Sequence, residues 1–245
     1  MVEINKELCI GCGRCAEDCI GKHINMIDKK AVMQEESFLC GHCVAVCPVN
    51  AVSIPEYEMA DVKEHQPGAG VTDIKELLHT IKCRRSIRSY QPTAVEQEKL
   101  ENLIQAGRYT ATAKNNQGCC FVIVQKELAG LKEMVWENID QLISECGNDI
   151  PNDLMPFHMF NQRRKADKQD DYLFRNAPAV MYITSEWPLD AGLAAQNIEL
   201  AAVTQGLGVL YNGFLARISD QNQALKEWLG IPDRTIKACM LIGYP

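Results

Sequence analysis

This sequence of 245 residues lacks several features that would direct it to particular classes of protein. No apolar run approaches the ~20 residues of a membrane-spanning helix, and residues 1–8 contain neither a basic region nor an apolar stretch. We therefore expect a cytoplasmic protein with no membrane partner. Lys and Arg number 25 against 32 Asp and Glu, a net charge of −7, so we expect no basic surface for a nucleic-acid partner.

Nucleotide-binding fingerprints are also missing. No strand pattern leads into G-x-G-x-x-G, and there is no G-x-x-x-x-G-K-[ST] loop. A nicotinamide donor, if the protein uses one, therefore has to bind outside a Rossmann domain. Hydrophobic residues make up 47% of the chain, which is typical of a globular protein with a sizeable core.

Cysteine, in contrast, is abundant. The chain has 12 cysteines, although a cytoplasmic protein has little use for disulfides. Residues 9–19 have the C-x2-C-x2-C-x3-C spacing of bacterial iron–sulfur proteins. The cysteines of this motif are Cys9, Cys12, Cys15 and Cys19. Glycines in the two-residue gaps let the first three thiolates converge, whereas the fourth lies about one helical turn further on and points elsewhere.

A second copy of the motif follows, with a serine in the place of its first cysteine. It consists of Ser37, Cys40, Cys43, Cys47 and Pro48. The two copies form an internal repeat. A zinc ribbon is the alternative interpretation, because two C-x2-C pairs could hold zinc, but it leaves three of the seven cysteines in this region without a role.

This repeat resembles a two-cluster bacterial ferredoxin. The resemblance implies one 4Fe–4S cluster with the ligands Cys9, Cys12, Cys15 and Cys47. It implies a second cluster, 4Fe–4S or 3Fe–4S, with the ligands Cys19, Cys40, Cys43 and Ser37. A hydroxyl is a weaker acid and a harder ligand than a thiol, so Ser37 would bind iron as an alkoxide, leave one iron to water, or lose that iron. We therefore expect the second cluster to be the labile one.

A change in composition divides the chain. Residues 61–73 are polar and include Pro67, Gly68 and Gly70, which is typical of a linker. We expect a ferredoxin-like iron–sulfur domain over 1–60 and a second domain over 74–245. Helix and strand patterns alternate in the second domain, so the expected fold class is α+β, with a mixed sheet flanked by helices.

Hydrophobic periodicity and capping residues predict the elements of 74–245. Ile74, Leu77, Leu78 and Ile81 have the spacing of a buried helix stripe. The capping box Thr93-Ala-Val-Glu96 is expected to begin the next helix. Further helices are predicted over 127–144, over 190–205 and from Ser219 to Gly230, and strands over 119–124, 179–184 and 235–242.

A cationic stretch stands out in this acidic chain. Residues 82–88 contain four cations, and Arg84, Arg85 and Arg88 surround Ser86. Arginine forks and a hydroxyl are what a bound phosphate requires, although a solvated face or a partner surface would have the same composition. Residues 112–117 form a polar turn whose amide side chains could hydrogen-bond a heterocycle.

Together these segments resemble the flavin-dependent nitroreductase family over residues 74–245. The resemblance implies an FMN phosphate site in the cationic stretch, flavin contacts from the polar turn across a homodimer interface, and a strand behind the flavin. The implied FMN-binding residues are Arg84, Arg85, Ser86, Arg88, Thr112, Asn115, Gln117, Leu207 and Gly208. No catalytic side chain is expected, because the chemistry would be centred on the flavin. Residues 146–175 match the variable region of the family, either a mobile lid or an ordinary helical insertion.

The two resemblances together imply an FMN-dependent oxidoreductase. It would pass electrons between iron–sulfur clusters, FMN and a small electron-poor acceptor such as a nitroaromatic or a quinone. The donor, NAD(P)H or a reduced ferredoxin, stays open. Two alternatives keep the fold: an electron-transfer protein whose flavin serves a protein partner, and a flavoenzyme of the reductive dehalogenase type. A pocket filled by Phe157 or Phe160 would favour the electron-transfer protein.

Overall fold

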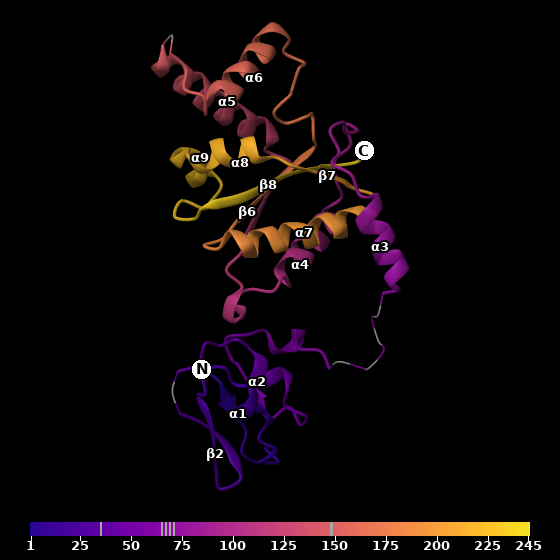
Figure 1. Ribbon diagram of the computed structural model, residues 1–245, viewed down its shortest axis with the longest axis vertical. Helices are drawn as coiled ribbons and strands as arrows, with labels where there is room; N and C mark the ends of the chain where they lie inside the picture. Colours follow the sequence, from indigo (N-terminus) through magenta and orange to yellow (C-terminus); the bar gives the residue numbers. More distant parts are fainter. Residues whose placement is uncertain (35, 65, 67, 69, 71, 148) are drawn as a thin grey trace. The chain divides into compact units, whose positions relative to one another are not determined.

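The computed structural model describes residues 1–245 except 35, 65, 67, 69, 71 and 148. The chain divides into two units (Figure 1). The first comprises Met1–Thr72 and Thr112–Asn116, and the second comprises Asp73–Ala111 and Gln117–Pro245. Among the helices of the described residues, none is long and apolar enough to span a membrane.

The first unit contains two small antiparallel sheets and short helices. Strand β1 (Glu3–Ile4) pairs with β4 (Val52–Ser53), and β2 (Ile24–Ile27) pairs with β3 (Lys30–Met33). The helices are α1 (Arg14–Asp18), α2 (His42–Ala45) and the 3-10 turns η1 (Met59–Asp61) and η2 (Ala113–Asn115). The core of this unit includes three buried cysteines, Cys9, Cys15 and Cys43.

Helices α1 and α2 begin in the same way. Each follows a glycine in the left-handed conformation, Gly13 with φ of 77° and Gly41 with φ of 82°. Glycine adopts this conformation without steric cost. In both cases the glycine carbonyl accepts hydrogen bonds from the N–H groups three and four residues on. The repeat in the sequence is therefore also a repeat of the backbone.

The second unit is built on a four-stranded antiparallel sheet. The strand order is β5 (Cys120–Val124), β6 (Ala179–Thr184), β8 (Ile236–Gly243) and β7 (Gly208–Tyr211). The three predicted strands are confirmed to within a residue at each end. Ser86 adds a parallel bridge to Val209.

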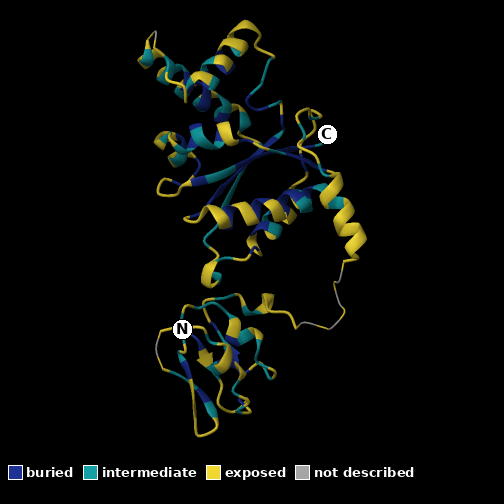
Figure 2. Cartoon of the chain, viewed as in Figure 1, coloured by how far each residue is buried: buried dark blue, intermediate teal, exposed yellow. Residues whose placement is uncertain are grey.

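Helices cover both faces of this sheet (Figures 1 and 2). One face packs against α4 (Gln97–Arg108) and α7 (Pro188–Thr204). The other packs against α5 (Leu128–Cys146), α6 (Met155–Ala166), α8 (Gly213–Asp220) and α9 (Gln223–Trp228). Along β6, Val180 and Tyr182 enter one core while Met181 and Ile183 enter the other. Burial on both faces explains the continuous apolar sequence of this strand.

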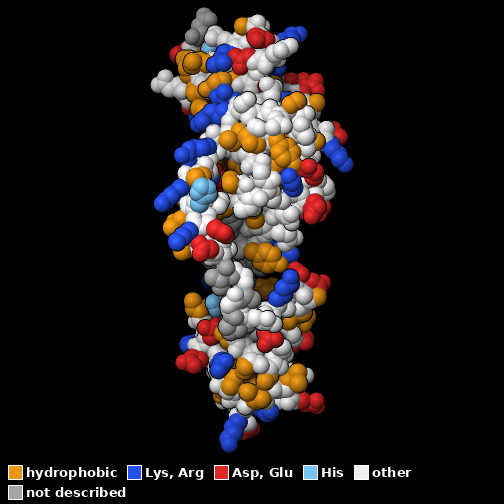
Figure 3. Space-filling model, turned by 90° about the vertical axis from the view of Figure 1, so that its right-hand side faces the viewer, with side chains coloured by type: hydrophobic (Ala, Val, Ile, Leu, Met, Phe, Trp, Pro, Cys, Tyr) orange, Lys and Arg blue, Asp and Glu red, His pale blue; other side chains and the backbone are white. Residues whose placement is uncertain are grey.

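Helix α3 (Ile74–Cys83) forms as predicted, but its apolar stripe is not buried. Ile74, Leu77, Leu78 and Ile81 are 61%, 38%, 42% and 43% exposed. The helix lies on the outside of the second unit, and Figure 2 shows it almost entirely exposed. Figure 3 shows the face that carries α3, where hydrophobic side chains lie exposed among charged ones. The prediction of a buried stripe was therefore wrong for the single chain.

Two predicted helix starts are also wrong. Helix α4 begins at Gln97 without a side-chain cap, and the Gln125 side chain bonds both the N–H and the C=O of Val95 at 2.9 Å. Ser219 lies inside α8, where its buried hydroxyl is 2.9 Å from that of Tyr182. Contacts with residues distant in the sequence therefore determine the conformation at Val95 and at Ser219. A local sequence pattern does not reveal such contacts.

Candidate functional site

Four cysteines line one small cavity in the first unit. They are Cys9, Cys12, Cys15 and Cys47, the set that the ferredoxin resemblance assigns to a single cluster. Apolar side chains such as Ile4, Ile10 and Val52 form much of the remaining lining. Several thiols facing one apolar cavity are the donor set and the surroundings that an iron–sulfur cluster requires.

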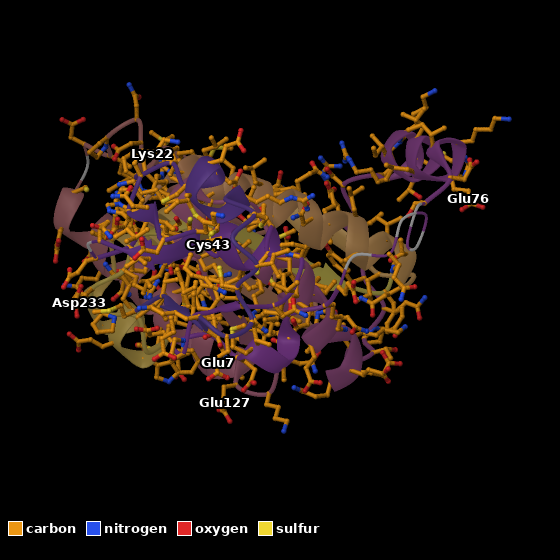
Figure 4. The ribbon with its side chains drawn as sticks, turned by 90° about the horizontal axis from the view of Figure 1, so that it is seen from below. Glu7, Lys22, Cys43, Glu76, Glu127 and Asp233 are labelled. Atoms are coloured by element: carbon orange, nitrogen blue, oxygen red, sulfur yellow. The ribbon has the colours of Figure 1, made fainter. Side chains whose placement is uncertain are left out.

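The thiols of this region differ in acidity. N–H groups of Ala31 and Gly11, and the ammonium of Lys30, hold the pKa of Cys9 below its ordinary value. Burial raises the pKa of Cys15 and raises that of Cys43 to about 11. Cys43 is buried, whereas Lys22, also labelled in Figure 4, lies at the edge of that view. A bound metal deprotonates a coordinating thiol, so the buried cysteines would become thiolates on iron binding.

Cys19 and Cys47 occupy equivalent positions in the repeat and accept equivalent hydrogen bonds. The N–H of His23 donates to the Cys19 sulfur at 3.4 Å, and the N–H of Ala51 donates to the Cys47 sulfur at 3.2 Å. Each donor lies four residues after its cysteine. Hydrogen bonds to sulfur stabilise a thiolate and tune the clusters that thiolates hold.

Ser37 has the local environment of its repeat counterpart, Cys9. The Ser37 hydroxyl oxygen accepts the N–H of Leu39 at 3.1 Å, and the Cys9 thiol accepts the N–H of Gly11, also two residues on. Leu39 and Gly11 are both left-handed, with φ of 54° and 73°. This conformation is unfavourable for leucine. The loop around Ser37 therefore has the same backbone conformation as the loop of the first motif, although Ser37 replaces Cys9 and Leu39 replaces Gly11.

Cys40 and Cys43 lie close enough for their charges to interact. Within the described residues, no three Cys, His, Asp or Glu side chains are grouped so as to hold a single metal ion. A cubane cluster places each cysteine on a different iron, which is a wider arrangement than the ligand shell of one ion.

In the second unit, the cationic stretch lies along strand β7. The N–H of Ile87 donates to the Val209 carbonyl at 3.0 Å. A Cβ atom at Gly208 would lie 2.5 Å from the Ile87 side chain, so only glycine permits this close approach. Leu207, beside it, is buried. Gly208 therefore positions the backbone of the cationic stretch.

Arg84 is paired with a buried carboxylate. Its guanidinium lies 3.2 Å from Oε1 of Glu199, a side chain that is almost fully buried in α7. Gln196 donates a further hydrogen bond to Glu199 at 3.3 Å. A buried carboxylate requires such partners. The neighbouring Arg85 is exposed and donates only to the carbonyls of Lys82 and Arg84.

Arg88 lines a cavity of about 450 Å³ in the second unit. Four aromatic residues share this lining, Phe160, Tyr172, Tyr211 and Phe214. Its volume is in the range of small-molecule sites. Among the described residues, no other member of the predicted FMN-binding set lines it.

Several residues of this cavity were missed by sequence reasoning. Tyr211, Asn212 and Gly213 line it where β7 ends and α8 begins. The Asn212 side chain accepts the N–H of Leu215 at 2.9 Å and donates to the Leu173 carbonyl at 2.6 Å. Asparagine after an apolar strand is a helix N-cap signal, which would have predicted this turn.

The polar turn belongs partly to the first unit. Asn115 donates from Nδ2 to the Cys40 carbonyl at 3.0 Å, and the Lys114 ammonium lies 4.3 Å from the centre of the Phe38 ring. Lys114, Asn115 and Gln117 all have positive φ. Contacts of Thr112, Asn115 and Gln117 with a flavin stay a prediction.

Comparisons with known proteins give a consistent result. Residues 81–244 match the family model described as the Nitroreductase family. A provisionally named NADH dehydrogenase/NAD(P)H nitroreductase of Archaeoglobus fulgidus is 27% identical over 176 residues, which are 70% of this chain and 87% of its own. The FMN reductase (NADPH) of Bacillus subtilis is 24% identical over 172 residues, covering 69% and 65% of the two chains. The FMN-bound nitroreductase structure of Bacteroides fragilis has a TM-score of 0.56 at 22% identity, over 69% of this chain and 88% of its own.

Proposed function

This chain belongs to the nitroreductase family of oxidoreductases, and on that premise we propose that it is an FMN-dependent enzyme with iron–sulfur clusters. It passes electrons between the clusters, the flavin and a small electron-poor acceptor such as a nitroaromatic or a quinone. The donor is NAD(P)H or a reduced ferredoxin. When bound, the clusters supply single-electron exchange, and FMN supplies exchange of one or two electrons.

The observation that carries the iron–sulfur part is the shared cavity of four thiols. Cys47 is 32 residues or more from the other three, yet it lines the same cavity as Cys9, Cys12 and Cys15. These four cysteines hold the first 4Fe–4S cluster. Cys19, Cys40 and Cys43 hold the second, with Ser37 at the fourth position, where the loop of Cys9 is repeated.

In the flavin site, the residues of the cationic stretch have different roles in binding. Arg85 and Ser86 are exposed, and they bind the FMN phosphate. Arg88 stands at the cavity and contacts the flavin ring system. Arg84 is engaged with Glu199, so it contributes mainly by holding the stretch against α7. Leu207 and Gly208 complete this part of the proposed site, and Thr112, Asn115 and Gln117 contact the flavin across the interface of a homodimer.

The open cavity favours a small acceptor over a relay to a protein partner. Phe157 is 1% exposed and does not line it, and Phe160 forms part of its wall. Neither ring fills the space of about 450 Å³. A reductive dehalogenase-type reaction would use the same cavity, and product analysis distinguishes it from nitro or quinone reduction.

We further propose a homodimer with FMN at its interface. The exposed apolar stripe of α3 supports it, because an uncovered helix face of this kind is typical of a surface that packs against another chain. The stripe lies directly before the cationic stretch in the chain, so a second copy packed on it would border the flavin site.

The visible spectrum of anaerobically purified protein tests this function. We expect flavin absorbance together with the broad absorbance of iron–sulfur clusters. Stopped-flow mixing with NADH, NADPH and a reduced ferredoxin then identifies the donor as the reagent that reduces the protein. The absorbance that bleaches first, that of the flavin or that of the clusters, shows where its electrons enter. Protein that retains no flavin after reconstitution, or whose reduced flavin no nitro or quinone compound reoxidises, would refute the proposal.

A pair of cysteine substitutions provides the control for the clusters. Cys15→Ser removes a thiol of the shared cavity, whereas Cys146→Ser removes one at the end of α5 that only donates to the Leu142 carbonyl. We expect Cys15→Ser to lose iron and Cys146→Ser to keep it. Equal iron in both variants would contradict the assignment of Cys15.

A further inference from the structure

The cavity of the second unit has a charge pattern that the proposed function explains only at Arg88. Arg88, Arg175 and Arg217 line it from three separate segments. In the part of the chain that the structure describes, no acidic side chain lines the cavity or pairs with any of these guanidinium groups. Like charges gathered in one place repel each other unless an anion lies between them.

The guanidinium groups of Arg175 and Arg217 are oriented without being neutralised. That of Arg175 lies 3.7 Å from the centre of the Tyr172 ring, and that of Arg217 lies 4.9 Å from the centre of the Phe157 ring. Arg217 also donates to the Asp153 carbonyl. Aromatic rings and carbonyls hold an arginine in place while its charge stays available to a ligand.

Two of these arginines, which line the same cavity, also influence the same tyrosine. Burial raises the pKa of the Tyr90 hydroxyl, and Arg175 and Arg88 both oppose this rise. Both positive charges therefore act on the same half-buried tyrosine, although 87 residues separate the two arginines in the chain.

The backbone that presents Arg175 is strained. Arg175 and Asn176 are both left-handed, with φ of 56° and 53°, which is unfavourable for residues with a side chain. Asp171 holds this turn by accepting the N–H of Asn176 at 3.2 Å, and Lys132 already neutralises the Asp171 carboxylate at 2.5 Å. Strain that the surroundings maintain is found where a side chain has to be placed for a function.

Aromatic rings complete the site. Phe160 packs against Tyr172 and Phe214, with ring centres 5.0 and 5.1 Å apart. Tyr211 and Phe214 remain 42% and 44% exposed at the cavity. Flat apolar surfaces beside unpaired arginines match a ligand that is planar at one end and anionic at the other.

We propose that this cavity binds the electron acceptor as an aromatic ring that carries an anionic group such as a carboxylate, and that Arg175 and Arg217 determine this specificity. The inference rests on the proposed function, which it narrows to one class of acceptor. Arg88 belongs to the flavin site, so the specificity depends on the other two arginines.

A matched pair of acceptors tests the proposal. 4-Nitrobenzoate and 4-nitrobenzamide have almost the same shape, but only the first is charged. We expect the wild type to have a higher kcat/KM for 4-nitrobenzoate. Arg175→Gln and Arg217→Gln should each lower the ratio of the two kcat/KM values about tenfold to a hundredfold, the usual effect of losing one charged hydrogen bond.

Arg163→Gln is the control variant. The Arg163 guanidinium also lies over the Tyr172 ring, at 4.3 Å, but it pairs with Asp170 and does not line the cavity. We expect it to keep the wild-type ratio. Calorimetric binding of benzoate and benzamide to the oxidised holoenzyme gives a second readout that needs no turnover, and only benzoate binding should weaken in the two cavity variants.

The same anionic chemistry occurs in the phosphates of NADPH and FMN. An Arg217→Gln protein that loses its preference between NADPH and NADH, or loses FMN, while keeping the acceptor ratio would overturn the assignment to the acceptor. So would a wild type that reduces both nitro compounds equally well. A protein that holds FMN but reduces neither compound, nor any other nitro or quinone acceptor, would instead refute the proposed function.

Discussion

Ser37 has the backbone setting of a cluster ligand but not its chemistry. The Ser37 hydroxyl accepts the N–H of Leu39, as the Cys9 thiol accepts that of Gly11. We expect Ser37→Cys to raise the iron content toward about eight per chain and to slow iron loss in air, because a thiolate binds iron more strongly than a hydroxyl. Iron and sulfide analysis with low-temperature EPR measures both effects.

Ser53→Cys is the control for this substitution, since it adds a thiol to β4 of the same unit outside both motifs. We expect it to leave iron content unchanged. If the wild type already carries two four-iron clusters that survive air, and Ser37→Cys adds nothing, then Ser37 is an adequate ligand and the second cluster is not labile.

Arg84 and Arg85 are adjacent in the sequence but serve different purposes in the structure. Arg84→Ala leaves the buried Glu199 carboxylate without its cation. We expect the free energy of unfolding to fall by about 3 kcal/mol, the lower end of the range for breaking a buried pair, because Arg84 itself is 36% exposed. Urea unfolding measures this, and adding Glu199→Gln should restore a large part of the loss.

Arg85→Ala is the matched variant. Arg85 is exposed and has only carbonyl partners, so its loss should change stability by less than about 0.5 kcal/mol. FMN affinity should fall about tenfold, as expected for one charged hydrogen bond. Equal stability of the Arg84 and Arg85 variants would show that the pair with Glu199 contributes nothing.

Some residues of the candidate sites could be predicted from the sequence, and others could not. Cysteine spacing is local, so it revealed the two copies of the motif, whereas the set of four thiols that share a cavity was implied by the ferredoxin resemblance. The cavity of Arg88 is assembled from segments around residues 88, 160, 172 and 211, and nothing in their sequence indicates that they meet. Arg84 belonged to a recognisable motif, but its buried partner lies 115 residues away in an apolar helix.

At the scale of elements, strands and helix ends differ in how predictable they are. Strand β6 is buried on both faces, and its apolar run was a sufficient signal. Helix α8 was not predicted, because its buried Ser219 suggested an N-cap while its true cap is Asn212. Helix α3 was predicted from its periodicity, but periodicity shows only which face is apolar and not what covers that face.

The exposed stripe of α3 gives the prediction at this scale. If it packs in the proposed homodimer, Leu78→Asp with Ile81→Asp should raise the dimer dissociation constant at least about a hundredfold, since each buried leucine or isoleucine contributes about 1.5–3 kcal/mol. Light scattering coupled to gel filtration measures the mass. Lys75→Asp, on the same helix, should leave the dimer intact. A wild type that is monomeric at all concentrations would contradict the homodimer.

At the scale of the whole molecule, each unit has its own hydrophobic core. Residues of the first unit form one cluster of buried side chains, and the sheet of the second unit separates two others. Fewer than 80 residues bury little apolar surface, so a unit of that size usually depends on bound metal or a similar reinforcement. We therefore propose that 1–60 and 74–245 fold as separate domains joined by residues 61–73.

Calorimetry of the full chain tests this division, with two unfolding transitions expected. Removing iron with a chelator should lower or abolish the transition of the first unit, because metal-binding energy is folding energy for a small domain. Adding FMN at about 100 times its dissociation constant contributes about 2.7 kcal/mol to the second unit alone. For ~170 residues, this raises the second transition by about 5–10 °C. A single transition that moves equally with iron and with FMN would mean that the two units unfold together, and the linker would then join parts of one cooperative structure.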